Sequence, residues 1–198
     1  MDPAASLRIG CLVMAAGNAS RFGANKLAAE LDGRTLIERA LDAVSKGTFA
    51  AVCVASQYEG IEELAGKYGF AAIHNAHPDW GLSYTIRLGT QAMRVCDGIL
   101  YLVADQPLLR RDSVRRIAEA WLRTPEKIAG ASHEGRRGNP NLFPARFFPE
   151  LLALEGDCGG NLVIKRHTED YLPVELAPEE LRDCDTPQEL AALRIQAE

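Results

Sequence analysis

A run of small residues followed by two cations, CLVMAAGNASRFGANKL at residues 11–27, has the composition of a phosphate-binding loop. A buried strand is expected to end near Ala15, and the small side chains that follow let a ligand reach the backbone, where Gly17 permits φ > 0. Successive exposed N–H groups bind anions, while Arg21 supplies a fork of donors and Lys26 a mobile charge. The segment is interpreted as a triphosphate site or, equally, as an ordinary connection with two solvated cations. The GxGxxG and GxxxxGKS/T fingerprints are absent.

A carboxylate follows the next long apolar run, GILYLVA at residues 98–104. This places Asp105 at the carboxyl end of a strand, the edge at which open α/β sheets bind ligands. A carboxylate is a hard oxygen ligand suited to Mg²⁺. The alternative is a cap for the following helix, but Asp112 is better placed for that, so the ligand interpretation is favoured.

Two further acids, Asp183 and Asp185, lie in RDCDTPQEL at residues 182–190. They precede a Thr-Pro helix start, and Asp185, alone or with Thr186, is expected to cap the helix that Pro187 opens.

Glycine-rich segments of the second half also carry polar side chains. Asp157 lies in GDCGG at residues 156–160, where it could approach a ligand or occupy a solvated turn. Residues 137–140 read as another turn, in which Asn139 could bond a heteroaromatic ring or form an Asx-turn.

The elements that must position these residues alternate between two patterns. Apolar runs predict strands at 9–15, 50–55, 71–74, 98–104, 127–132 and 171–176. Helical periodicity or helix signals mark 35–46, 61–68, 84–95, 113–122, 145–154, 159–167 and a last helix from residue 187. Strands buried on both faces that alternate with helices predict an α/β domain with a largely parallel sheet.

Composition narrows the class of protein. The chain has 198 residues, with 47% apolar and 25% charged, as in ordinary globular domains, and a single domain is expected. The net charge of −5 argues against a nucleic-acid binder, although a local cation cluster would still suit an anionic small molecule. No apolar run approaches the roughly 18 residues of a membrane span. The start of the chain does not resemble a signal peptide.

The cysteines indicate a cytoplasmic protein with reduced thiols. There are five, they are widely spaced, and no CxxC occurs, which disfavours a disulfide or zinc framework.

The first motif resembles a known family. AAGNASRFGANKL is similar to the LAAGxSxRxGxxK signature of the MobA-like nucleotidyltransferases, in which this loop wraps the NTP and the Arg and Lys bind its phosphates. The Ala-Ala-Gly form, residues 15–17, resembles the cytidylyltransferase branch, since the guanylyl-transferring branch usually has Gly-Gly here. The DQP at residues 105–107 is similar to the family's metal-binding DxP motif.

The resemblance continues into the second half. GRRGNPNLFPARFF and LLALEGDCGGNLVIKR, at residues 135–148 and 151–166, resemble the molybdopterin-cytidylyltransferase pattern. That pattern usually has His where this chain has Asn139, and a small residue with Arg where it has Gly160-Asn161. Both departures lie in the half that receives the acceptor.

The segment NAHPDWGLSYTIR, residues 75–87, also resembles the cytidylyltransferase branch. The resemblance implies that Ser83 and Arg87 lie near the nucleotide or the acceptor. Trp80 is expected to be a core residue rather than a stacking surface, because Trp is largely buried on average.

Together, these motifs imply a single-domain Rossmann-like three-layer α/β/α nucleotidyltransferase fold over residues 1–198. The implied activity is transfer of CMP from CTP to molybdenum cofactor with release of pyrophosphate, and a molybdenum hydroxylase could receive the product. Two alternatives remain: transfer to another acceptor, such as a sugar or polyol phosphate, and a protein that delivers the cofactor without turnover. Neither nucleic acid nor membrane is an expected partner. Mg²⁺ is the implied cofactor, held by Asp105 and Asp185 with Asp183 as the fallback ligand.

The expected roles are then these. The catalytic residues are Arg21, Lys26 and Asp105; the nucleotide-binding residues are Ala15, Ala16, Gly17, Asn18, Ser20, Arg21, Lys26, Ser83 and Arg87; and the acceptor-binding residues are Asn139 and Asp157.

Overall fold

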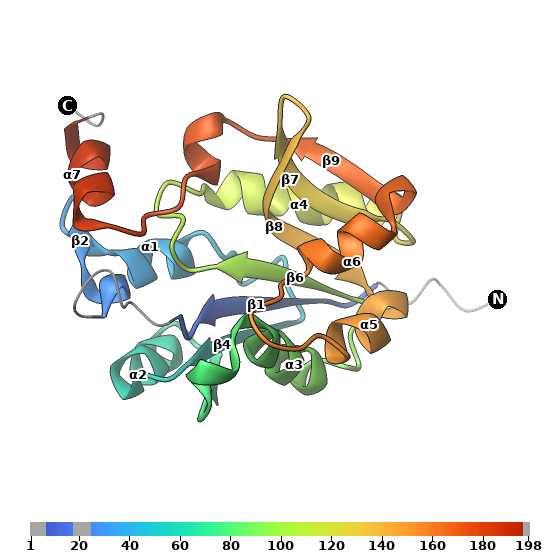
Figure 1. Cartoon of the computed structure of the whole chain (residues 1–198), viewed down its shortest axis with the longest axis horizontal. Helices are drawn as coiled ribbons and strands as arrows, with labels where there is room; N and C mark the ends of the chain where they lie inside the picture. The colour runs from blue at the N-terminus through green and yellow to red at the C-terminus, as the bar shows by residue number, and fades with distance from the viewer. Residues whose placement is uncertain (1–6, 18–24, 196–198) are drawn as a thin grey trace.

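The computed structural model describes residues 7–17 and 25–195, which fold around one seven-stranded sheet (Figure 1). The strands are β1 (Ile9–Ala15), β4 (Ala51–Ser56), β5 (Ala71–His74), β6 (Gly98–Val103), β7 (Ile128–His133), β8 (Arg136–Pro144) and β9 (Tyr171–Glu175). Their order is β5-β4-β1-β6-β8-β7-β9, and β8 alone runs antiparallel to its neighbours. A two-stranded ribbon, β2 (Glu30–Leu31) with β3 (Arg34–Thr35), lies outside this sheet.

Helices cover both faces of the sheet. They are α1 (Leu36–Asp42), α2 (Glu59–Lys67), α3 (Leu82–Ala92), α4 (Arg111–Arg123), α5 (Phe148–Leu152), α6 (Asn161–Arg166) and α7 (Pro187–Ile195). Side chains of α1, α2, α4 and α7 form one apolar cluster, and those of α3, α5 and α6 form a second. The predicted Rossmann-like three-layer α/β/α fold with a mostly parallel sheet is therefore confirmed.

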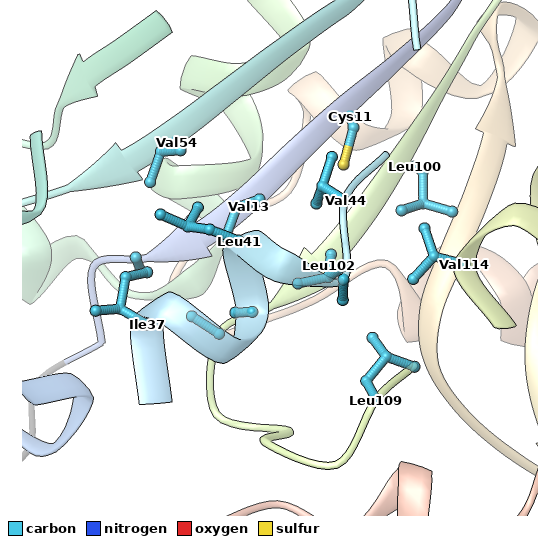
Figure 2. Close-up of a cluster of buried hydrophobic side chains, with 14 of the residues drawn as sticks. Cys11, Val13, Ile37, Leu41, Val44, Val54, Leu100, Leu102, Leu109 and Val114 are labelled. Atoms are coloured by element: carbon cyan, nitrogen blue, oxygen red, sulfur yellow. The ribbon is translucent and has the colours of Figure 1, made fainter. Parts of the chain in front are cut away.

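The central strand β1 connects the two layers because its side chains alternate between them. Cys11 and Val13 pack with α1 and β4 in the cluster of Figure 2, whereas Leu12 points to the opposite face. On that face α3 lies very close to the sheet: a Cβ at Gly89 would stand 2.3 Å from a Leu12 methyl carbon. Glycine at this position therefore fixes how near α3, and the loop that precedes it, lies to β1.

The strand predictions agree with the structure, and the turn predicted at residues 137–140 is wrong. These residues lie inside β8, and the hairpin turns instead at Glu134 and Gly135, which have φ of 46° and 78°. Pro140 argues against a strand when it is read in sequence, but the ladder accommodates it through an irregular register between Gly130 and Ser132 of β7. The helix predicted for 35–46 is shorter in the structure than predicted. Thr35 is its N-cap and lies outside the helix, which ends at Asp42.

Two further features bear on the class of protein. Within the described residues, no helix is long and apolar enough to cross a membrane. All five cysteines are free; Cys158 is exposed and the other four are buried. Burial raises the pKa of the Cys11, Cys53, Cys96 and Cys184 thiols, which makes them poor nucleophiles.

Candidate active site

A cavity of about 620 Å³ opens where β1 and β6 end side by side. The two strands are parallel neighbours, with Met14 opposite Val103, so the residues that follow them meet at one edge of the sheet. Six of the residues predicted from the sequence line the cavity: Ala16, Gly17, Lys26, Asp105, Asp157 and Asp185. The structure thus brings the start of the small-residue loop and the two predicted metal-binding acids to one place.

Lys26 bridges the two acids. Its Nζ donates to Oδ2 of Asp105 at 2.8 Å and to Oδ1 of Asp185 at 2.7 Å. Burial lowers the pKa of Lys26, but the hydrogen bonds and charges of the two carboxylates outweigh this effect and leave the pKa above its ordinary value. The group is therefore a charged ammonium at neutral pH.

Local capping interactions leave these side chains free to converge. Lys26 opens a short 3₁₀ helix, η1 (Lys26–Ala28), whose Asn25 side chain accepts from the Leu27 N–H. At α7 the cap is Thr186: its Oγ1 accepts from the Glu189 N–H, and the Glu189 carboxylate accepts from the N–H groups of Asp185 and Thr186. Because Thr186 is the cap, the Asp185 carboxylate is available to Lys26.

A main-chain hydrogen bond holds the two acidic segments together. The Cys184 N–H donates to the Asp105 carbonyl oxygen at 2.8 Å, which seats the segment before α7 against the end of β6. Asp183 faces elsewhere, with its Oδ1 accepting from Nε2 of Gln106 at 3.0 Å. Burial raises the pKa of Asp183, and the charge of Asp105 raises it further. Asp185, rather than Asp183, is thus the acid that meets Lys26.

The convergence of Asp105 and Asp185 fits a magnesium ion. Both carboxylates approach a single point, the Lys26 nitrogen, so their oxygens are at most 5.5 Å apart. Mg²⁺ typically binds one or two carboxylates and completes its octahedron with water and substrate phosphates. Within the described part of the chain, three side chains of types that bind metal ions lie close together elsewhere: His167, Glu169 and Asp170. That group does not line the cavity. Of the four aspartates that do, Asp105 and Asp185 are the two that converge on Lys26.

The remaining predicted residues have other positions. Ala15 is buried at the end of β1. Ser83 is buried and Arg87 lies over the Tyr84 ring, and neither lines the cavity. Asn139 is in β8 with its side-chain oxygen accepting from Asn141, also outside the cavity wall. The structure does not bring these three polar residues to the cavity, and their binding roles stay predictions. Asn18, Ser20 and Arg21, which were also predicted to bind the nucleotide, lie outside the described residues.

Trp80 is not the core residue that was expected. It is 49% exposed and lines the cavity from the 3₁₀ helix η2 (Pro78–Trp80). The His77 ring stacks on it at a centroid distance of 4.0 Å and 7° between planes, and Tyr84 meets it edge-on at 4.9 Å. In the sequence, Trp80 stands between Asp79 and Gly81 and belongs to no helical stripe of apolar residues. This context indicated an exposed side chain, but the prediction gave more weight to the fact that Trp is usually buried.

Two glycines join the walls of the cavity. Gly81 has φ of 84°, and a Cβ there would lie 2.5 Å from the carbonyl of Gly156, so both its conformation and its close contact require glycine. The Gly156 carbonyl accepts from the Ser83 N–H, and Oδ1 of Asp157 accepts from the Leu82 N–H, each at 3.3 Å. Asp157 therefore caps the start of α3 while it lines the cavity.

Comparisons with known proteins agree with this architecture. The sequence profile of the MobA-like NTP transferase domain family matches residues 11–171. The chain is 28% identical to the purine catabolism protein PucB of Bacillus subtilis (strain 168) over 194 residues, which cover 91% of this chain and 93% of PucB.

Two solved structures share the fold. One is a nucleotidyl transferase from Methanothermobacter thermautotroptrophicus, with a TM-score of 0.77 and 23% identity over 96% of this chain and 97% of that one. The other is Rv0371C of Mycobacterium tuberculosis H37Rv in complex with manganese, with a TM-score of 0.74 and 18% identity over 96% of this chain and 100% of that one.

Proposed function

The chain belongs to the MobA-like NTP transferase family, and on that premise we propose that it transfers CMP from CTP to a molybdopterin-type cofactor and releases pyrophosphate. Residues 1–198 would act as one such domain, with Mg²⁺ as its metal. The observation that carries the proposal is the convergence of Lys26, Asp105 and Asp185 at the edge of a cavity that begins at the small-residue loop.

The charges of the site suit attack by one anion on another. An acceptor phosphate is already ionised at pH 7, so the chain needs no general base to activate it. The barrier comes from repulsion between the reactants and from charge that develops on the leaving pyrophosphate. Positioning and electrostatic stabilisation lower such a barrier without covalent chemistry.

Different residues of the chain would have different roles in this reaction. Lys26, with Arg21 and the amides of the small-residue loop, would hold the triphosphate and stabilise the leaving group. Asp105 and Asp185 would hold Mg²⁺, which neutralises phosphate charge and orients the reacting oxygens when bound. The Cys184–Asp105 main-chain bond keeps the two carboxylates in place before substrate arrives.

The preference for CTP rests on Ala16. Ala16 lines the cavity immediately after β1, where the guanylyl-transferring branch usually has glycine. A purine is larger than a pyrimidine, so a methyl group there should disfavour GTP more than CTP. Ala15, the other alanine considered, is buried in the strand and does not line the cavity, so we assign the steric effect to Ala16.

The acceptor is proposed from the sequence resemblance of the second half. The name of PucB refers to purine catabolism. A molybdenum hydroxylase that oxidises a purine would account for both that name and a molybdopterin acceptor. A sugar or polyol phosphate is the alternative acceptor within the same chemistry. A delivery module without turnover is disfavoured because Lys26, Asp105 and Asp185 form a complete ionic site.

A pyrophosphate-release assay tests the proposal. The protein is incubated with Mg²⁺, each of the four NTPs and either molybdenum cofactor, a sugar phosphate or a polyol phosphate. We expect release only with molybdenum cofactor and fastest with CTP. Release with another acceptor would replace the acceptor, and binding of cofactor with no release under any NTP would support the delivery module.

A further inference from the structure

The part of the cavity wall that is formed by η2 carries a rigid aromatic surface. Trp80 is about half exposed, although burial of such a ring would be favourable. One of its faces is covered by His77, and Tyr84 packs against it edge-on, so the ring is held in one orientation. An exposed indole that its neighbours immobilise presents a flat apolar surface to a ligand at little entropic cost.

The charges on this wall differ from those at the Lys26 end. Asp79, next to Trp80, and Asp157, at the start of α3, both line the cavity and are exposed. Oδ1 of Asp157 accepts from the Leu82 N–H, which leaves its other oxygen without a bond in the described structure. Carboxylates repel phosphate and accept from N–H donors, so this wall favours a ring edge that is rich in N–H groups.

We propose that Trp80, with Asp79 and Asp157, forms a stacking site for the flat 2-amino-4-oxopyrimidine ring of a pterin-class acceptor. The inference rests on the proposed function and extends it to the recognition of the acceptor ring. In-line displacement places the attacking oxygen opposite the leaving one. With the pyrophosphate held at Lys26, the acceptor lies away from that residue, and the Trp80 wall offers it an aromatic surface within the same cavity.

The chemistry of the ring edge separates the pterin from the nucleotide base. A 2-amino-4-oxopyrimidine presents an amino group and a ring N–H side by side, and one carboxylate can accept both. Cytosine presents a single amino group beside acceptor atoms. The two acids at the Trp80 wall therefore match the pterin edge better than the cytosine edge.

Fluorescence quenching tests the site without any reaction. The chain has two tryptophans, and Trp121 is 1% exposed, so acrylamide should quench mainly Trp80. We expect the free ring 2-amino-4-oxopteridine to protect Trp80 from acrylamide and cytidine to leave the quenching unchanged. The Trp80→Phe variant should lose the quenchable component, which identifies the signal. Protection by cytidine and not by the pteridine would overturn the proposal, as would protection by neither.

Kinetics provide the second readout. Trp80→Leu keeps an apolar side chain but removes the flat surface, and should raise the KM for the acceptor about tenfold, within the range seen when stacked bases lose their aromatic partner. The KM for CTP should stay unchanged, and Trp80→Phe should restore most of the acceptor affinity. Leu122→Ala, which removes an exposed apolar side chain from α4 outside the cavity, is the matched control and should change neither KM. A rise in the CTP KM alone would overturn the proposal.

His77 is a positioning residue in this scheme, because it contacts Trp80 and does not line the cavity. His77→Ala should raise the acceptor KM and leave kcat at saturation unchanged, and His77→Phe should rescue it. The two proposals can fail separately. Pteridine protection of Trp80 without CMP transfer would refute the function and keep the site, whereas transfer with an unaltered acceptor KM in Trp80→Leu would refute the site and keep the function.

Discussion

Replacing Lys26 with methionine should change metal and nucleotide affinity in opposite directions. The Lys26 ammonium stands 2.8 and 2.7 Å from the carboxylates proposed to hold Mg²⁺, so it occupies the point that a divalent ion needs. Methionine keeps the length and apolar character of the stem and removes the charge. A metal would then enter without competition, while the triphosphate would lose a cation.

The solvent exposure of the three charged side chains determines how large the change in affinity should be. The side chains of Lys26, Asp105 and Asp185 are 13%, 26% and 47% exposed, so these ion pairs lie between surface and buried ones. Surface pairs contribute about 0.2–1 kcal/mol, and breaking a buried pair costs about 3–5 kcal/mol. An intermediate value of about 1.4 kcal/mol corresponds to a factor of about ten. Mn²⁺ should therefore bind Lys26→Met about tenfold more tightly, and CTP without metal at least about tenfold more weakly.

Two titrations measure these effects. Free Mn²⁺ is followed by its electron paramagnetic resonance signal in the absence of nucleotide, and CTP binding is followed by calorimetry without divalent ions, at low and moderate salt. Lys67→Met, at an exposed lysine of α2, controls for loss of one positive charge. If Mn²⁺ binds Lys26→Met no more tightly than the unaltered protein, the ammonium does not compete with metal and the reasoning is refuted. Unchanged CTP affinity would leave Lys26 as a structural bridge alone.

Four other substitutions test separate parts of the site. Asp105→Asn should remain folded and lose most of its turnover, and near-normal pyrophosphate release would remove the metal assignment. The unaltered protein should prefer CTP over GTP by at least about tenfold in kcat/KM; Ala16→Gly should narrow that ratio and Ala15→Gly should not, and equal use of both nucleotides by the unaltered protein would contradict the steric argument. Burial raises the pKa of Asp183, so the folded chain holds this proton more tightly than the unfolded chain, and ionisation destabilises the fold as the pH rises. Asp183→Asn should therefore raise the denaturation midpoint at pH 7, and the gain should vanish as the pH falls below the ordinary carboxyl range; a gain that is equal at pH 3 and pH 7 would exclude titration as its cause.

The strand ends were the part of the site most readily predicted from the sequence. Apolar runs that stop abruptly located the end of β1 and placed Asp105 just beyond β6, and parallel pairing brought them together. Local patterns could not choose between Asp183 and Asp185. That choice depends on Lys26, which is 159 residues from Asp185 and reaches it only through the tertiary fold.

Site residues that were predicted from a motif were less reliable where the motif lies on a helix. In α3 the cavity face carries Leu82 and Thr85, three residues apart, as helical geometry requires. Ser83 is rotated about 100° from Leu82 and is buried. The motif could place Ser83 near the site in sequence, but the rotation of α3 against β1 decides which side chains line the cavity.

The hydrogen bond between the Cys184 N–H and the Asp105 carbonyl has a consequence for how this protein can diversify. It joins two segments separated by most of the second half of the chain, and it uses main-chain atoms that every non-proline residue possesses. The spacing of the two carboxylates is therefore independent of the side chains between them, and added residues there raise the cost of closing the loop only slowly. The loops between residues 106 and 183, including the Asp157 segment, can therefore change in length and composition while this main-chain contact is kept. On the proposed function, the reaction chemistry and the choice of acceptor would then be carried by separable parts of one chain.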